Sequence, residues 1–247
     1  MIRAATAAEL AALAPDNEAA VRIAGLAAAY GTERPFVRFW SGENGSRIAL
    51  MDGLATVAAC PQEREELALF LSMHPEIAAV RTDAALAQML AAAGWAVKTG
   101  EVMTPAVRFA PPGAPVEALP AREMYPVLAA VFGETVPPFD VWYADVSHRL
   151  RHDAARIAGI RENGQAVAVA MTTAECPGAA LIGAVATLPA SRGKGYAAAC
   201  VSSLAAQLQR EGRRVLLSPK NDRAKALYAR LGFVVCGEWG LAERVLK

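Results

Sequence analysis

The chain has 247 residues, of which 54% are hydrophobic and 20% are charged. This composition excludes a disordered chain, because it supplies enough apolar side chains to form a core. The 25 basic and 24 acidic residues nearly cancel, so the chain lacks the positive field that a nucleic-acid partner requires. At roughly 100–200 residues per domain, the length favours two globular domains.

Two further observations concern the cellular compartment. No segment approaches the roughly 18 consecutive apolar residues of a membrane-spanning helix, and the first residues contain no apolar signal-peptide core. We therefore expect a cytoplasmic protein with no membrane contact. The four cysteines form no C-x-x-C pair, so they predict reduced and mostly buried thiols, with no metal site. They are Cys60, Cys176, Cys200 and Cys236.

Apolar periodicity in the first half predicts helices and strands in a definite order. The expected helices are Ala7–Leu13, Glu18–Tyr30, Glu63–Met73 and Asp83–Ala92. The expected strands are Val37–Ser41, Ser46–Met51, Leu54–Ala59, Ile77–Arg81 and Trp95–Met103. Hairpin signals at residues 42–45 and at Asp52-Gly53 indicate that the first three strands after residue 36 are antiparallel neighbours.

A stretch rich in proline and glycine, Phe109–Pro115, separates this half from the rest and predicts domains at residues 1–110 and 116–247. The same order of elements then returns. The expected helices are Arg122–Phe132, Phe139–Leu150, Gly195–Glu211 and Asp222–Arg230. The expected strands are Arg156–Arg161, Gln165–Thr173, Ala180–Leu188, Arg214–Ser218 and one that begins at Phe233.

The two halves also share a local signature. Gly94-Trp95 and Gly232-Phe233 each place a glycine at the end of a helix and an aromatic residue at the start of a strand. We interpret the repeat as an ancient duplication. The expected fold class is α/β (α+β), with two tandem domains that each contain a mostly antiparallel mixed sheet flanked by helices.

The main candidate site is the turn between the strand that ends at Leu188 and the helix that follows it. Its sequence is Arg192-Gly193-Lys194-Gly195-Tyr196-Ala197. A glycine-rich turn at a helix N-terminus presents unpaired N–H groups to a phosphate, and Arg192 and Lys194 add positive charge. A nucleotide P-loop does not fit, because Gly195 is not followed by Lys and Ser or Thr. A dinucleotide fingerprint does not fit either, because residue 198 is alanine.

The turn and its surroundings resemble the GNAT superfamily of N-acetyltransferases. Arg192, Gly195 and Ala197 match the R/Q-x-x-G-x-G/A signature of that family, and the run from Asn221 to Phe233 resembles its second motif. The resemblance covers residues 117–247 well and implies that acetyl-CoA binds at the turn. It further implies backbone contacts to the pantetheine arm. The implied coenzyme-binding residues are Val185, Ala186, Thr187, Arg192, Gly193, Lys194, Gly195, Tyr196, Ala197 and Asn221.

Two residues of the second motif have alternative interpretations. Asn221 precedes a helix, so it fits a helix cap as well as a coenzyme contact. Tyr228 fits a buried core residue, but the resemblance gives it the catalytic role of protonating the departing thiolate. The corresponding position in the first half is Leu90, and residues 61–67 there contain no glycine and three carboxylates. We therefore expect residues 1–110 to be a degenerate GNAT-like domain and the chain to have one active site.

The expected reaction is transfer of acetyl to a small-molecule or peptide amine by direct attack in a ternary complex. The alternative is a regulatory module that binds acyl-CoA without turnover. The sequence leaves the acceptor amine and the oligomeric state open. It also leaves the general base open, with Glu175, Asp145 and Glu238 as weak candidates. A metal site at His148 and His152 is disfavoured, because no third ligand has a suitable spacing.

Overall fold

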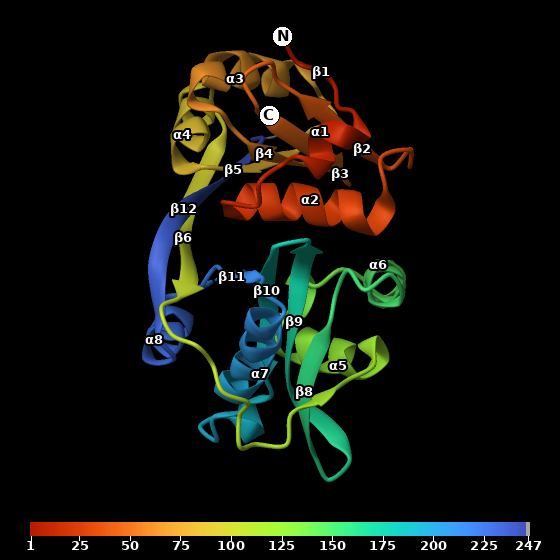
Figure 1. Cartoon of the computed structure of the whole chain (residues 1–247), viewed down its shortest axis with the longest axis vertical. Helices are drawn as coiled ribbons and strands as arrows, with labels where there is room; N and C mark the ends of the chain where they lie inside the picture. Colours follow the sequence, from red (N-terminus) through yellow and green to blue (C-terminus); the bar gives the residue numbers. More distant parts are fainter. Residues whose placement is uncertain (246–247) are drawn as a thin grey trace. The chain divides into compact units, whose positions relative to one another are not determined.

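The computed structural model describes residues 1–245. Contacts divide them into two compact units (Figure 1). Unit 1 contains Met1–Val102 together with the C-terminal stretch from Val235, and unit 2 contains Met103–Val234. In the described part of the chain, no helix is both long and apolar enough to cross a membrane.

Unit 1 is a mixed sheet with helices on both faces. Its sheet order is β1-β2-β3-β4-β5-β12, in which β4 and β5 are parallel and the other pairs are antiparallel. The strands are β1 (Arg3–Ala4), β2 (Val37–Ser41), β3 (Arg47–Met51), β4 (Leu54–Ala58), β5 (Ala79–Thr82) and β12 (Phe233–Glu243). The helices are α1 (Ala7–Ala11), α2 (Glu18–Tyr30), α3 (Arg64–Met73) and α4 (Ala84–Ala92), with a 3₁₀ turn at Pro61–Glu63.

Strand alternation distributes the core of unit 1 between the two faces. Ala49 packs with Leu10 and Ile23 against α1 and α2. Its neighbour in β3, Ile48, packs with Leu67 of α3 and Leu90 of α4 on the opposite face. Leu90 is fully buried, so the position that corresponds to Tyr228 is part of the hydrophobic core.

Unit 2 repeats this plan. Its sheet order is β7-β8-β9-β10-β11-β6, in which β10 and β11 are parallel and the other pairs are antiparallel. The strands are β7 (Glu117–Ala118), β8 (Ile157–Glu162), β9 (Gln165–Cys176), β10 (Ala179–Thr187), β11 (Arg214–Leu217) and the end of β6 (Ala96–Pro105), whose residues before Met103 belong to unit 1. The helices are α5 (Ala121–Phe132), α6 (Phe139–Arg151), α7 (Tyr196–Arg210) and α8 (Asp222–Arg230), with 3₁₀ turns at Gly133–Thr135 and Pro189–Ser191.

Helices α5 and α7 lie on opposite faces of the sheet of unit 2 (Figure 1). Met124 of α5 packs with Val169 of β9 on one face. Leu204 of α7 and Tyr228 of α8 pack with Ala168 on the other face. The mixed α/β fold class predicted from the sequence is confirmed.

The last strands of the two halves are exchanged. In a simple repeat β12 would pair with β11 and β6 with β5, but β12 pairs with β5 from Gly240↔Thr82 to Glu243↔Ala79. In turn, β6 pairs with β11 at Met103↔Leu217. The compact units therefore divide the chain differently from the predicted domains 1–110 and 116–247, because sheet pairing joins the last strand to unit 1.

Arg244 tests whether the C-terminal stretch completes unit 1. Its guanidinium donates hydrogen bonds to the carbonyls of Ile77, Leu71, Ser72 and His74 at 2.7–3.0 Å. Because hydrogen bonds from charged groups are the strong ones, Arg244→Ala should lower the free energy of unfolding of unit 1 by about 2 kcal/mol. Amide exchange in α3 and α4 under denaturant measures this loss.

The control for Arg244→Ala is Lys98→Ala. Lys98 forms a 3.0 Å ion pair with Glu243, and its side chain is 70% exposed. Exposed ion pairs contribute at most about 1 kcal/mol, so this variant should unfold almost like the wild type. Equal effects of the two substitutions would show that Arg244 does not anchor the C-terminal stretch.

Candidate functional site

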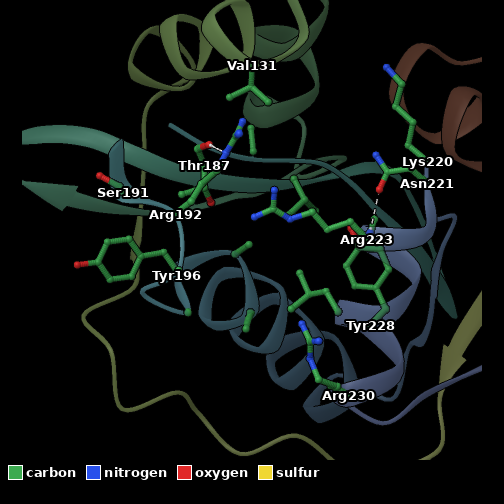
Figure 2. A pocket seen from close by; sticks show the side chains of 18 of the residues that line it. Val131, Thr187, Ser191, Arg192, Tyr196, Lys220, Asn221, Arg223, Tyr228 and Arg230 are labelled. Carbon is green, nitrogen blue, oxygen red and sulfur yellow. Dashed lines mark hydrogen bonds between the residues drawn. The ribbon is translucent and has the colours of Figure 1, made fainter. Parts of the chain in front are cut away.

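Unit 2 contains a pocket of about 630 Å³, formed by β10, the turn before α7, and α8 (Figure 2). The end of α5 also contributes to its wall. The pocket brings together nine of the ten residues that the sequence assigned to coenzyme binding, and also Tyr228. The nine are Val185, Ala186, Thr187, Arg192, Gly193, Gly195, Tyr196, Ala197 and Asn221.

The glycine turn leaves the N-terminus of α7 without a side-chain cap. Gly195 is the N-cap residue with φ of 79°, and Gly193 has φ of 83°. This left-handed backbone favours glycine. The first intrahelical bond runs from Ala199 N–H to the carbonyl of Gly195, so the amides of the preceding turn have no helical acceptor. These amides and the helix dipole make a site for an anion.

Lys194 is the predicted site residue that lies outside the pocket. Its ammonium contacts the Glu162 carboxylate at 2.6 Å. The same carboxylate accepts hydrogen bonds from Tyr196 Oη at 2.6 Å and Ser191 Oγ at 2.9 Å. Glu162 therefore ties the hairpin between β8 and β9 to the turn, and it holds Lys194 away from the position that the sequence suggested.

The same contacts keep Glu162 ionised. Lys194 lowers the pKa of the Glu162 carboxyl to about 2, with further contributions from Tyr196 and Ser191. Because the pKa of Glu162 is depressed in the folded protein, the ion pair is fully formed at pH values above the pKa of an ordinary glutamate. It is lost only as the pH falls toward 2.

Strand β10 extends beyond its parallel partner. The register between β10 and β11 runs from Ala179↔Arg214 to Ile182↔Leu217, where β11 ends. The register of β10 with β9 shifts between Gly183 and Ala186, and Ala184 in that bulge has φ of 49°. The β10 backbone after Ile182 therefore has an edge that β11 does not cover, and such an edge can pair with an extended ligand.

Thr187 lies at the end of this edge. Leu188 N–H donates to the carbonyl of Val167 in β9, so Thr187, one residue earlier, directs its backbone groups to the other side. Its carbonyl accepts a 3.2 Å hydrogen bond from Arg192 Nε, drawn as a dashed line in Figure 2. The Thr187 hydroxyl is buried without a partner in the described chain. A buried unpaired hydroxyl costs free energy, so it is a donor available to a ligand.

Tyr228 lines the pocket from α8, and its side chain packs near Phe233 with ring centroids 6.1 Å apart. The residue is 6% exposed. Burial raises the pKa of its phenol to about 12. Tyr228 therefore belongs to the core and reaches the pocket, and its hydroxyl keeps its proton at neutral pH.

Asn221 caps α8, because its side-chain oxygen accepts a 2.9 Å hydrogen bond from Ala224 N–H. It also lines the pocket, so the two interpretations of this residue are compatible. The cap fixes the start of α8 and thereby the positions of the residues that follow it.

Sequence reasoning missed several residues of the pocket wall. Three are basic, namely Lys220, Arg223 and Arg230, and two are apolar residues of α5, Val131 and Phe132. The sequence could have predicted that Arg223 and Arg230 lie together, because residues 223, 227 and 230 share one face of a helix. No local signal in the sequence brings α5 to this pocket.

The candidate general bases lie elsewhere. Glu175 is buried and held by Arg156 and Arg213 at 2.8 and 2.9 Å, which gives it a structural role. Asp145 pairs with Arg149 at 3.0 Å. Glu238 is exposed on β12 in unit 1. No aspartate or glutamate of the described chain lines the pocket.

The histidine pair does not make a metal centre by itself. The rings of His148 and His152 stack with centroids 4.1 Å apart. Within residues 1–245, no group of three or more histidine, cysteine, aspartate or glutamate side chains is arranged to hold a metal ion.

Residues 121–233 match the model of the acetyltransferase (GNAT) family. They therefore form a GNAT acetyltransferase domain, which lies in unit 2 and includes all residues of the pocket. A comparison with curated protein sequences finds no match.

Solved structures with the same fold extend over almost the whole chain. A GCN5-related N-acetyltransferase from Kribbella flavida is 18% identical with a TM-score of 0.64, covering 94% of this chain and 98% of that one. Another from Sphaerobacter thermophilus is 20% identical with a TM-score of 0.61, covering 99% and 95%. A tandem GNAT protein from the clavulanic acid biosynthesis pathway is 16% identical with a TM-score of 0.64, covering 99% and 98%. At these identities the similarity concerns the fold alone.

The titration of Glu162 tests the contact that holds Lys194. In Lys194→Met the carboxylate loses its cation, so its pKa should rise from about 2 toward the ordinary range. Carbon-detected NMR of the Glu162 carboxyl between pH 6 and 3 measures this change. The wild-type signal should barely move over that range. Lys225→Met is the control, because it removes a lysine from α8 and leaves the contact between Lys194 and Glu162 in place. Identical titration curves for the wild type and both variants would refute the contact.

Proposed function

We propose that unit 2 binds acetyl-CoA and transfers its acetyl group to an amine by direct attack in a ternary complex. One observation carries this proposal. A single pocket contains an uncapped helix N-terminus, the uncovered edge of β10 and a protonated buried tyrosine. These three features suit, in turn, a pyrophosphate, an extended amide-containing arm and a leaving thiolate.

The residues of the pocket fit this coenzyme. The amides at the start of α7 would hold the pyrophosphate, with Arg192 beside them. The backbone of Val185–Thr187 would pair with the pantetheine arm, and the orphaned hydroxyl of Thr187 would gain a partner there. When bound, acetyl-CoA supplies an activated thioester, so the protein has mainly to position the two reactants.

Proton transfer is divided between Tyr228 and solvent in this proposal. The Tyr228 hydroxyl would give its proton to the thiolate as it leaves, and, because its pKa is raised to about 12, it would take a proton back from water. The attacking amine must lose a proton. No carboxylate of the described chain lines the pocket, so we assign that proton to water. The acceptor is a small-molecule or peptide amine.

A free-thiol release assay tests the proposed reaction. Acetyl-CoA and a panel of small and peptide amines are incubated with the full chain, and thiol release is followed together with acetylated product. Amine-dependent release supports the transferase. Tight coenzyme binding with no turnover on any amine would instead identify a non-catalytic acyl-CoA-binding module.

Gly195 tests the placement of the pyrophosphate. A Cβ at Gly195 meets no protein atom within 4 Å, so a valine side chain would occupy the space in which the phosphate approaches the backbone. Gly195→Val should weaken CoA binding by more than about tenfold, or about 1.4 kcal/mol, in a calorimetric titration.

Gly164→Val is the matched control for Gly195→Val. Gly164 lies in the hairpin between β8 and β9, has the same φ of +79°, and has no atom within 4 Å of an added Cβ. Both variants therefore carry the strain of a valine in the left-handed region. Only the variant at Gly195 should lose affinity for CoA. Equal affinities in the two variants would show that the pyrophosphate binds elsewhere.

Tyr228→Phe separates catalysis from packing. It keeps the ring but removes the proton donor, so turnover with an acceptor amine should fall by about 10²–10⁴-fold or slightly less, because thiolate is a fair leaving group. CoA affinity should barely change, and stability should fall by at most about 1 kcal/mol. Because the pKa of Tyr228 is about 12, the wild-type rate should show no decline from this group between pH 7 and 10.

Tyr125→Phe is the control for loss of a tyrosine hydroxyl. Tyr125 Oη donates to the carbonyl of Pro137 and does not line the pocket. This variant should retain the wild-type rate. Normal turnover in Tyr228→Phe would limit Tyr228 to packing and leave catalysis to positioning alone.

A further inference from the structure

One side of the pocket carries basic residues that the proposed pyrophosphate site at the start of α7 does not use. Arg223 and Arg230 are seven residues apart on α8, about 10 Å along the helix axis, and Leu227 lies between them on the same face. Lys220 precedes the helix, with its ammonium 5.3 Å from the centroid of the Phe132 ring. All four of these α8-side residues line the pocket. Figure 2 shows the side chain of Arg223 extending from α8 into the pocket space.

These cations differ from several basic residues of unit 2, whose side chains are paired with carboxylates. Lys194, Arg149 and Arg161 each form ion pairs with carboxylates. Among residues 1–245, no salt bridge joins Lys220, Arg223 or Arg230 to an acidic group. The described wall of the pocket also contains no acid. The α8 side is therefore an uncompensated positive surface, which attracts an anion.

The pyrophosphate does not need this surface. The uncapped amides of α7 and the adjacent Arg192 already provide donors and positive charge for it. Coenzyme A carries a third phosphate, a monoester at the 3′ position of its ribose. A phosphate monoester bears a charge between about −1.5 and −2 near neutral pH, and guanidinium groups bind such oxygens with strong charge-assisted hydrogen bonds.

We infer that Lys220, Arg223 and Arg230 form a second phosphate subsite, which binds the 3′-phosphate and makes the protein select CoA over dephospho-CoA. This inference rests on the proposed function, since it concerns the same coenzyme in the same pocket. Asn221 contributes indirectly, because its cap fixes the first turn of α8, from which Arg223 projects.

A comparison of the two coenzymes tests the subsite. Calorimetric titration of the full wild-type chain should give an affinity for CoA at least about tenfold higher than for dephospho-CoA. In the double variant Arg223→Gln/Arg230→Gln, CoA affinity should fall by about tenfold or more while dephospho-CoA affinity stays within about twofold of wild type. The preference between the two ligands should therefore nearly disappear.

The matched control is Lys225→Gln/Arg210→Gln. It removes the same formal charge from α8 and α7, but neither residue lines the pocket. The control should keep the wild-type preference. Equal wild-type affinities for the two coenzymes, or a preference that survives in Arg223→Gln/Arg230→Gln, would overturn the subsite alone. Failure of the wild type to bind either coenzyme would overturn the proposed function and the subsite with it.

Discussion

The uncapped N-terminus of α7 is the constraint on which the arrangement of the site depends. A helix end leaves several amides without acceptors, and a side-chain cap can satisfy one of them. Asn221 does this for α8 and Asp83 does it for α4. Gly195 has no side chain that could cap α7, and its left-handed backbone leads the chain directly into the helix. The free amides therefore face the pocket, where an anionic ligand would satisfy them.

The surrounding contacts keep this helix end open. Glu162 binds Ser191, Lys194 and Tyr196, so its carboxylate fixes the turn while remaining outside the pocket. The early end of β11 at Leu217 leaves the last part of β10 uncovered. The hydroxyl of Thr187 stays buried without a partner. This unpaired hydroxyl costs stability when the pocket is empty, and a ligand that supplies its missing partner relieves the cost.

Unit 1 shows the same plan without this opening. Glu63 stands at the start of α3 and accepts hydrogen bonds from the backbone amides of Asn44 and Ser46. A carboxylate therefore lies at the helix start whose counterpart in unit 2 is a glycine turn. Leu90 fills the core at the position that corresponds to Tyr228. Because of these two differences, we propose that unit 1 is the degenerate member of the pair and supports unit 2 without binding a coenzyme.

Local chemistry explains which features the sequence could predict. The glycine turn, the cap at Asn221 and the alternation of helices and strands depend on residues close together in the chain. The direction of Lys194 depends on Glu162, 32 residues away, and no local pattern reports it. The exchange of β6 and β12 depends on pairing between distant strands. Periodicity predicts that a strand exists but does not choose its partner.

A crystal structure of the full chain grown with acetyl-CoA tests the central claim most directly. The account predicts one coenzyme per chain, with its pyrophosphate on the amides at the start of α7, its arm along β10, and its thioester sulfur within hydrogen-bonding distance of Tyr228 Oη. A coenzyme in unit 1, a coenzyme in unit 2 away from the Gly193–Ala197 turn, or an empty pocket at saturating acetyl-CoA would contradict it.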